Sequence, residues 1–269
     1  MARQGNPDAD AILDQEFPVL NMGSVSLVDY MGSDSRIVEA ARVSVGRKKS
    51  LRKDRDLIDY LVRNQHLTPM EFVSLTFRIR LPIFVARQLA RYRHSSVVEV
   101  SGRYTELPPD FYVPEWDRIL GQDTKNRQGS EGELPDDTRA KFLGAVRSDQ
   151  SIVYRNYERA RKQGISRELS RINLPVSIYT ELVWKTDLRS LFNFLKQRLH
   201  PHAQKEMQEY ASAMAVCTQR VAPMAYAAFE EHILEAVTFP ASSARWLREH
   251  LRGVDGIPEG VLTALAEGR

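Results

Sequence analysis

The sequence predicts an α+β fold in which a small sheet of few strands is flanked by many helices. Two kinds of pattern indicate it. Strand-like alternation of apolar and polar residues is confined to short stretches, whereas helical spacing of apolar residues recurs along much of the chain. The chain has 269 residues, of which 42% are hydrophobic and 27% charged, enough for a sizeable core.

Residues 1–16 look like a loose leader, and short helices are predicted over 35–44 and 53–64. The second helix has apolar residues on one side, as expected for a helix that packs on a core; these are Leu57, Ile58, Leu61 and Val62.

A helix start is predicted at Thr68-Pro-Met-Glu71, with Thr68 as the N-cap, Pro69 in the first turn and Glu71 completing a capping box. The next stretch, 73–81, alternates apolar and polar residues and predicts a strand with one buried face. Pro82 then opens a helix predicted over Ile83–Tyr92.

The polar stretch 118–136, rich in turn-forming residues, reads as an exposed insertion. A long helix is predicted over 137–163, a short one over 166–171 and a second strand over 176–185. Further helices are predicted over 187–197, 202–220 and 223–236, and from Pro240 into the tail. The helix over 187–197 has apolar residues at i, i+3, i+4 and i+7; these are Leu188, Leu191, Phe192 and Leu195.

Composition narrows the class of protein. No apolar run approaches the ~20 residues of a transmembrane helix, and the N-terminus lacks the apolar stretch of a secretory signal, so a cytoplasmic protein is expected. The net charge of +3 is mild. Cys217 is the only cysteine, which excludes an intramolecular disulfide. It falls in a stretch of small apolar residues that indicates a packed thiol, not an activated nucleophile.

Arginines and hydrogen-bonding side chains are concentrated between Arg87 and Tyr104. On a helix, Arg87 and Gln88 share a face with Arg91, and in an extended chain Glu99, Ser101 and Arg103 point to one side. Guanidinium, hydroxyl, amide and carboxylate groups together suit a ligand that carries both a phosphate and a heterocycle. On charge alone, a solvated basic helix followed by a polar loop is the more common interpretation.

The arrangement of these residues resembles the signature of the flavin-dependent thymidylate synthases, Arg-His-Arg-x-x-Ser-x-Asn-Glu-x-Ser-x-Arg-Tyr. The matches in register are Arg91, Arg93, Ser96, Glu99, Ser101, Arg103 and Tyr104. Tyr92 stands in place of the family His and Val98 in place of the Asn, and Phe72 departs where the family often has His. So many matches at fixed spacing form a specific signal.

The resemblance continues outside the signature, from about Val25 to about Phe229. Further blocks occur in the family order: Ala40–Ser44, His66–Glu71, Pro82–Gln88, Arg171–Pro175 and Arg189–Arg198, which His202-Ala-Gln204 continues. The resemblance implies one domain over residues 1–269, with the insertion 118–136 and a C-terminal extension 237–269. It also implies the family fold of the thymidylate synthase-complementing proteins, a small, mainly antiparallel sheet flanked by many helices.

The resemblance further implies the site. Positions that surround dUMP are matched by Gln88, Leu89, Ala90, Arg91, Glu99, Val100, Ser101, Gly102, Arg103, Arg171 and Arg198. Positions that hold FAD are matched by Ser44, Thr68, Glu71, Arg91, Tyr92, Arg93, Glu99, Asp187, Leu188, Arg189, Asn193 and His202. His66 matches a histidine on the folate and flavin side. No metal site is expected, because His200-Pro-His202 has no evident third ligand.

The implied reaction is reductive methylation of dUMP to dTMP, with 5,10-methylenetetrahydrofolate as carbon donor, FAD as hydride carrier and NADPH as reductant. Arg198 matches the catalytic arginine that stabilises negative charge on the uracil ring. Ser101 is a nucleophile by position only, and a binding role is favoured because no partner base is evident. The implied assembly is a homotetramer whose active sites form where subunits meet.

Two alternatives remain open. A diverged paralogue would bind FAD or dUMP without turnover. A nucleic-acid-binding protein would use the arginine helix, but Glu99, Glu106 and the modest net charge argue against nucleic acid as a partner.

Overall fold

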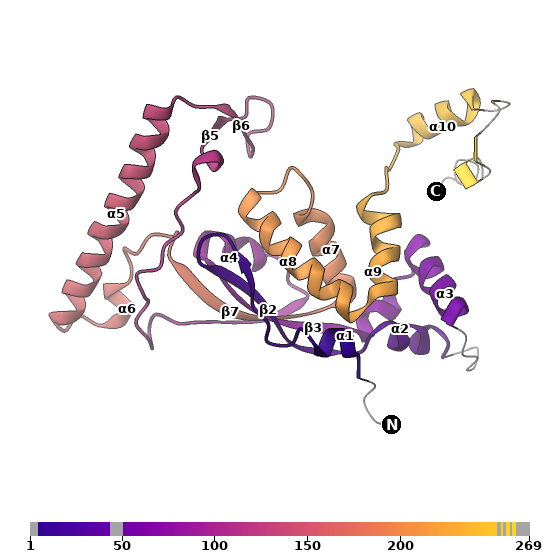
Figure 1. Ribbon diagram of the computed structural model, residues 1–269, viewed down its shortest axis with the longest axis horizontal. Coiled ribbons are helices and arrows are strands. Elements are labelled where there is room, and N and C mark those ends of the chain that lie inside the picture. The colour runs from indigo at the N-terminus through magenta and orange to yellow at the C-terminus, as the bar shows by residue number, and fades with distance from the viewer. Residues whose placement is uncertain (1–4, 44–50, 252–253, 255–256, 259, 262–269) are drawn as a thin grey trace. The chain divides into compact units, whose positions relative to one another are not determined.

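The computed structural model describes residues 5–43, 51–251, 254, 257–258 and 260–261. The chain divides into two compact units, residues 1–229 and residues 230–269. The larger unit contains the sheet and every residue predicted to form the site (Figure 1). Ser44 is a predicted FAD-binding residue that lies outside the described residues.

An antiparallel five-stranded sheet of order β1-β2-β3-β7-β4 forms the centre of the larger unit. Its strands are β1 (Phe17–Val19), β2 (Gly23–Met31), β3 (Ser74–Pro82), β4 (Ser95–Glu99) and β7 (Tyr179–Asp187). This confirms the predicted α+β class with a small antiparallel sheet. Because β4 is an edge strand, the signature residues that it carries lie at the border of the sheet.

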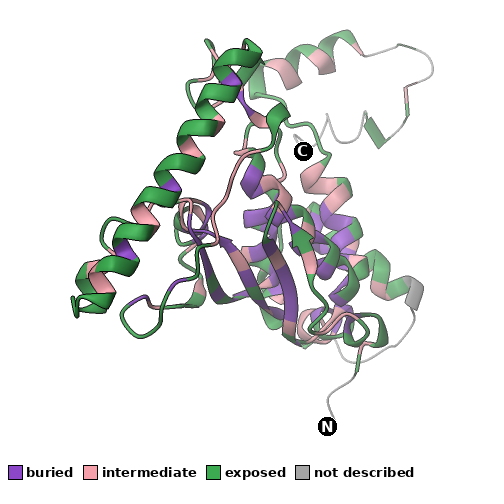
Figure 2. Ribbon diagram, turned by 60° about the vertical axis from the view of Figure 1, so that its left-hand side comes forward, coloured by how far each residue is buried: buried purple, intermediate pink, exposed green. Residues whose placement is uncertain are grey.

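One face of the sheet is buried, as the alternation in β3 predicted. Phe77 of β3 is paired with Trp184 of β7, so both side chains project from the same face, and their rings lie 6.2 Å apart. Trp184 also contacts Phe194, with ring centroids 5.4 Å apart. The opposite face carries Arg78 and Val183, which are exposed; Figure 2 shows the buried strands and the exposed surface.

Helices α4 (Ile83–Leu89), α7 (Leu188–Arg198) and α8 (Lys205–Val221) lie on the buried face of the sheet (Figure 1). The predicted apolar stripe of α7 is confirmed, because Leu188, Leu191, Phe192 and Leu195 are all buried. Asp187 starts this helix as its N-cap, and its carboxylate accepts hydrogen bonds from the backbone N and the Oγ of Ser190, both at 2.8 Å.

A second group of helices packs together. It consists of α2 (Asp34–Ala41), α3 (Leu51–Arg63), the 3₁₀-helix η1 (Thr68–Phe72) and α9 (Pro223–Phe229). This group meets the first group where η1 contacts α7 and where α9 contacts α8. The carboxylate of Asp34 accepts hydrogen bonds from the backbone N of Met224 and of Ala225, at 2.8 and 3.0 Å, and so joins α2 to α9. Burial raises the pKa of Asp34 despite these hydrogen bonds.

The segment between β4 and β7 contains the long helix α5 (Asp136–Lys162), which is exposed along most of its length (Figure 2). The short helix α6 (Arg167–Ser170) follows it. The predicted insertion, residues 118–136, is ordered: after the 3₁₀-helix η2 (Trp116–Arg118), it forms an antiparallel hairpin of β5 (Leu120–Gln122) and β6 (Ser130–Glu133).

The prediction of a loose leader over residues 1–16 is wrong for its described part. Residues Pro7–Asp10 form α1, and the Nδ2 of Asn6 donates to the carbonyls of Arg220 and Val221 at 3.0 and 2.9 Å. These bonds anchor the segment to the end of α8, a contact across more than 200 residues of sequence that no local pattern reveals.

Several predicted boundaries also need correction. Thr68 is not an N-cap, because η1 is capped at Leu67 without a side-chain hydrogen bond. Helix α4 ends at Leu89, not at Tyr92, and α8 begins at Lys205, not at His202. The extended chain predicted over 99–103 stops after β4, because the backbone N of Tyr104 and that of Thr105 both bond to the carbonyl of Ser101 and close a turn.

The C-terminal unit begins with a π-helical turn, η3 (Glu230–Leu234), so the helix predicted over 223–236 is regular only to Phe229. The predicted helix in the tail is confirmed as α10 (Ala241–His250). Within this unit, an open hollow is lined by Phe239, Ser242, Ser243, Trp246 and Leu247, none of which is a predicted site residue. Among the described residues, no helix is both long and apolar enough to cross a membrane.

Candidate active site

The predicted catalytic arginine lies at the centre of a connected set of polar side chains. Arg198 is the last residue of α7, where the helix dipole favours a cation. Its Nε donates to the hydroxyl of Tyr92 at 3.0 Å, and its Nη1 donates to the Oε1 of Gln88 at 3.4 Å. The Arg198 guanidinium also lies 5.5 Å from the centroid of the Tyr92 ring. Residues expected on the dUMP side and on the FAD side are therefore in direct contact.

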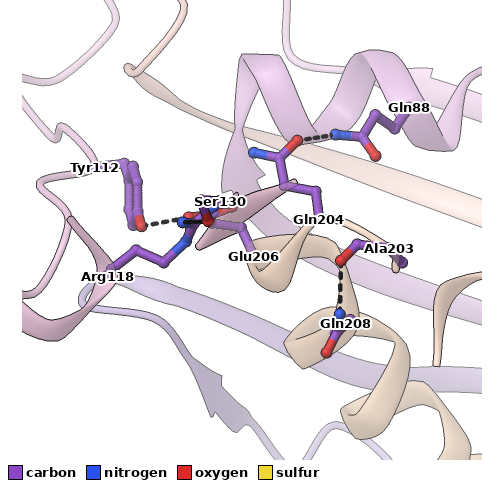
Figure 3. Close-up of polar contacts among 8 residues, drawn as sticks. All are labelled: Gln88, Tyr112, Arg118, Ser130, Ala203, Gln204, Glu206 and Gln208. Atoms are coloured by element: carbon purple, nitrogen blue, oxygen red, sulfur yellow. Dashed lines mark hydrogen bonds and ion pairs between the residues drawn. The ribbon is translucent and has the colours of Figure 1, made fainter. Parts of the chain in front are cut away.

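The same network extends in both directions. On one side, the Nε2 of Gln88 donates to the Oε1 of Gln204, which precedes α8 (Figure 3). On the other side, the Tyr92 hydroxyl donates to Gln197 Oε1 at 3.1 Å, and Gln197 Nε2 donates to Asn193 Oδ1 at 3.0 Å. We call these residues the Arg198 cluster: Gln88, Tyr92, Asn193, Gln197, Arg198 and Gln204.

Two members of the Arg198 cluster were not predicted as site residues. Gln204 belongs to a family block but had no assigned role, and Gln197 had none either. Gln197 could have been found from the sequence. It follows Asn193 by four residues on α7 and therefore lies on the same helix face as that predicted site residue. Gln204 meets Gln88 only through the packing of α8 against α4, which a local pattern does not reveal.

The turn after β4 brings together a second set of predicted residues. Gly102 is buried, and a Cβ atom built on it would lie 3.0 Å from the Cδ of Arg171 and 3.2 Å from the Cδ1 of Leu107. Arg103 is paired with Glu168 of α6 at 3.5 Å, and Arg167 donates to the carbonyl of Tyr104 at 3.2 Å. We call residues 101–105 together with Arg171 the Gly102 turn. A side chain at Gly102 would be in tight contact with Arg171, which would have to shift by a few tenths of an ångström.

Glu99 lies at the end of β4 and connects this region to β7. The hydroxyl of Thr180 donates to Glu99 Oε1 at 2.9 Å, and the backbone N of Val100 donates to the carbonyl of Glu181 at 2.9 Å. Glu99 is paired with Leu182, so its side chain projects from the face that the helices cover. Among the described residues, no hydrogen bond or ion pair joins the Arg198 cluster to the Gly102 turn.

Apart from Tyr92 and Asn193, the predicted flavin-side residues described next lie outside the Arg198 cluster, and all of them except the half-buried Asp187 are exposed. Arg189, near the start of α7, is paired with Glu71 of η1 at 2.6 Å, and both side chains are about half exposed. Asp187 is held as the N-cap of α7. His66 is exposed and its ring meets the edge of Tyr60 at 6.0 Å, and the rings of His202 and His200 stack at 5.0 Å.

The remaining predicted residues divide by exposure. Leu89 and Leu188 are buried in the core. The others are exposed, which leaves them accessible to a ligand or to a second chain: Thr68, Ala90, Arg91, Arg93 and Val100. The expectation that Arg91 shares a helix face with Arg87 is wrong, because α4 ends before it.

A buried carboxylate supports the end of α8 that carries Gln204. Arg118 Nε and the Tyr112 hydroxyl donate to Glu206 Oε1 at 2.7 and 2.8 Å, as Figure 3 shows. Burial pushes the pKa of Glu206 up, but the hydrogen bonds from Arg118 and Tyr112 outweigh burial, so the pKa is lowered overall. Burial, and then the nearby carboxylate, raises the pKa of Tyr112. The ion pair fixes the hairpin insertion to the first turn of α8.

The only cysteine is inaccessible. Cys217 is fully buried within α8, and burial raises the pKa of its thiol to about 12. The interpretation of Cys217 as a packed thiol is therefore confirmed, since neither exposure nor a neighbouring cation favours the thiolate.

The chain resembles proteins of known class over most of its length. Residues 26–224 match the family described as thymidylate synthase complementing protein. The chain is 45% identical over 245 residues to a flavin-dependent thymidylate synthase of Treponema denticola, and this alignment covers 90% of this chain and 92% of the relative. It is 47% identical over 232 residues to a flavin-dependent thymidylate synthase of Thermus thermophilus, and this alignment covers 86% of this chain and 84% of the relative.

Among solved structures, a UMP/dUMP methylase from Streptomyces cacaoi bound with 5-Br dUMP has a TM-score of 0.74 and 33% identity, covering 81% of this chain and 99% of that one. The chain therefore belongs to the family of flavin-dependent thymidylate synthases. This confirms the family recognised from the Arg91–Tyr104 signature.

Proposed function

We propose that this protein methylates dUMP reductively to dTMP, with 5,10-methylenetetrahydrofolate as carbon donor, FAD as hydride carrier and NADPH as reductant. The observation that carries the proposal is the Arg198 cluster, in which the expected catalytic arginine is held between Gln88 and Tyr92. The names of the relatives and the 5-Br dUMP bound to the solved methylase support the same substrate.

In this proposal the nucleotide is held by guanidinium, amide and carboxylate groups with distinct tasks. Arg198 stabilises the negative charge that develops on the uracil ring, a cationic contribution that is strongest in a site shielded from water. Gln88 and Glu99 supply an amide and a carboxylate for hydrogen bonds to polar groups of the nucleotide. Arg171, Arg103 and Arg91 carry planar forks that suit its phosphate.

The residues on the flavin side fit a flavin dinucleotide. Arg91, Arg93, Arg189 and Asn193 are exposed donors, and guanidinium groups match the diphosphate of FAD. Asp187 fits less well, since its carboxylate is anionic and already bonded to Ser190. When bound, FAD would supply the hydride transfer that side chains cannot perform. The task of this chain is to hold and orient the cofactor beside Arg198.

The route avoids an enzyme thiol. A cysteine nucleophile would have to reach the pyrimidine as a thiolate, and burial both encloses Cys217 and opposes its ionisation. The charge on the uracil ring is therefore developed against Arg198 and not through a covalent bond to Cys217.

We further propose that the active protein is a homotetramer in which neighbouring copies complete each site. Among the described residues of one chain no hydrogen bond or ion pair joins the Arg198 cluster to the Gly102 turn, and most of the predicted ligand-binding side chains are exposed. Large apolar side chains are also exposed beside the Gly102 turn, as expected of a protein interface; they are Val98, Val100, Tyr104, Leu169 and Ile172.

The test is release of tritium from 5-tritiated dUMP by purified protein supplied with FAD, methylenetetrahydrofolate and NADPH. We expect dTMP and tritiated water to form together, and the protein to show flavin absorbance. FAD and dUMP binding without tritium release would indicate a paralogue without turnover. Binding of neither, with salt-dependent binding of DNA instead, would overturn the enzymatic proposal.

A further inference from the structure

Tyr92 occupies a fixed position between α4 and β4. Its ring meets the edge of Phe194 with centroids 4.9 Å apart, and its carbonyl accepts a hydrogen bond from the Oγ of Ser95 at 2.6 Å. The aromatic contact and the backbone contact hold the side chain without any help from its hydroxyl. Removing the hydroxyl alone should therefore leave the ring and the backbone in place.

The hydroxyl of Tyr92 uses both its donor and its acceptor capacity. It accepts from Arg198 Nε at 3.0 Å and donates to Gln197 Oε1 at 3.1 Å. The hydrogen bond from Nε to Tyr92 fixes one edge of the guanidinium. Gln88 accepts a hydrogen bond from Nη1 only. This leaves Arg198 oriented with donor capacity remaining on its terminal nitrogens.

We infer that Tyr92 is a positioning residue that orients Arg198 for the pyrimidine through an uncharged hydroxyl. The inference rests on the proposed function, in which Arg198 meets the uracil ring. Tyrosine suits this role because a phenol cannot become a cation, whereas the imidazole of histidine, the residue in the family signature, can. Arg198 is the charged group in contact with Tyr92; Phe194, Gln197 and Asn193 beside it are neutral.

The charges along the chain sharpen this contrast. Arg91 and Arg93 flank Tyr92 in sequence, and Arg198 contacts it from α7, so these neighbours are all cationic. A protonated imidazole at this position would repel Arg198. A neutral imidazole would offer one donor and one acceptor, as the hydroxyl does.

The test measures dUMP affinity by titration calorimetry on the full-length protein. We expect Tyr92→Phe to weaken dUMP binding about tenfold, because a hydrogen bond to a charged group is lost. Tyr30→Phe is the matched control: it removes a hydroxyl that bonds Asn6 and Asp10, outside the Arg198 cluster, and dUMP affinity should not change. In an Arg198→Lys background, Tyr92→Phe should change the affinity by less than about twofold.

A pH series distinguishes positioning from a merely structural role. The ratio of the dUMP dissociation constant of Tyr92→His to that of the wild type should rise as the pH falls through the imidazole titration, near or below about 6.5. Using the ratio removes the titration of the dUMP phosphate. Suppose that the wild type binds dUMP. A ratio of dissociation constants that does not change with pH, or a Tyr92→Phe variant with wild-type dUMP affinity, then overturns this inference but not the proposed function. A wild type that binds no dUMP overturns the proposed function and this inference with it.

Discussion

Arg118 and Glu206 form an ion pair in which the Nε of Arg118 lies 2.7 Å from Glu206 Oε1 and the Nη2 lies 3.3 Å from Oε2. The carboxylate is 3% exposed and lies two residues beyond Gln204, which bonds Gln88. The pair therefore connects the hairpin insertion to the end of α8 that contributes to the Arg198 cluster.

Arg118→Ala should lower the free energy of unfolding by about 2–3 kcal/mol, because Glu206 stays buried and keeps only Tyr112 as a side-chain donor. Urea denaturation measures this. Arg127→Ala in the same hairpin is the control, since that residue is exposed, and its effect should stay within about 0.5 kcal/mol. Equal effects of the two substitutions would mean that the ion pair does not stabilise the fold.

Glu206 should also make stability depend on pH. Its pKa is lowered in the folded state, so the charged carboxylate contributes stability above the pKa of an unfolded glutamate, about 4.3. That contribution is lost as the pH falls from there through the lower folded-state pKa. Urea unfolding at about pH 7 and at about pH 4 should show a smaller decline for Glu206→Gln than for the wild type. Parallel declines would contradict the lowered pKa.

The sequence predicted those elements whose pattern is local and regular. Strand β3 alternates without interruption, and its register with β7 is continuous from Ser74 to Pro82. By contrast β1, three residues long, and β2 were missed. In β2 the pairing with β3 shifts between Leu27 and Asp29, so the alternation that marks a half-buried strand is broken there.

The site was predictable as a set of residues but not as an arrangement. Sequence blocks identified Gln88, Tyr92 and Arg198, but Tyr92 and Arg198 are 106 positions apart, so their hydrogen bond depends on how the segment after α4 packs against α7. The alternation over 99–103 predicted side chains on one side of a strand, whereas the bonds to the carbonyl of Ser101 close a turn. That turn brings Gly102 against Arg171, a proximity that spacing alone does not reveal.

Gly102→Ala should weaken dUMP binding by up to about tenfold, because the new methyl group would lie 3.0 Å from the Cδ of Arg171, so this proposed phosphate-binding arginine would have to shift by a few tenths of an ångström. Gly144→Ala is the control. It adds the same methyl group on α5, where no atom beyond its chain neighbours and the surrounding helix backbone lies within 4 Å, and it should leave dUMP affinity unchanged while stabilising the helix by up to about 1 kcal/mol. Calorimetric titration of both variants decides, and wild-type affinity in Gly102→Ala would contradict the role of the turn.

Cys217 should be chemically silent in the folded protein. Its thiol is fully buried, with its pKa raised to about 12 by burial, so iodoacetamide should modify it only after denaturation. Mass spectrometry of native and denatured samples measures this. Cys217→Ala should retain dTMP formation per folded active site, and a loss of turnover without loss of folding or of dUMP binding would reinstate a thiol mechanism.

Arg189 is expected to act in cofactor binding and not in stability. Its ion pair with Glu71 is exposed, with side chains 52% and 44% accessible, and such pairs contribute about 0–1 kcal/mol. Arg189→Gln should therefore leave the free energy of unfolding nearly unchanged but weaken FAD binding about tenfold, because a charge-assisted bond to the diphosphate is lost. Flavin absorbance in a titration of the protein with FAD measures the affinity.

Arg78→Gln removes an equally exposed arginine from the opposite face of the sheet, and it should bind FAD like the wild type. If both variants lost affinity to the same degree, general electrostatic attraction would explain the effect, and Arg189 would have no specific contact with the cofactor.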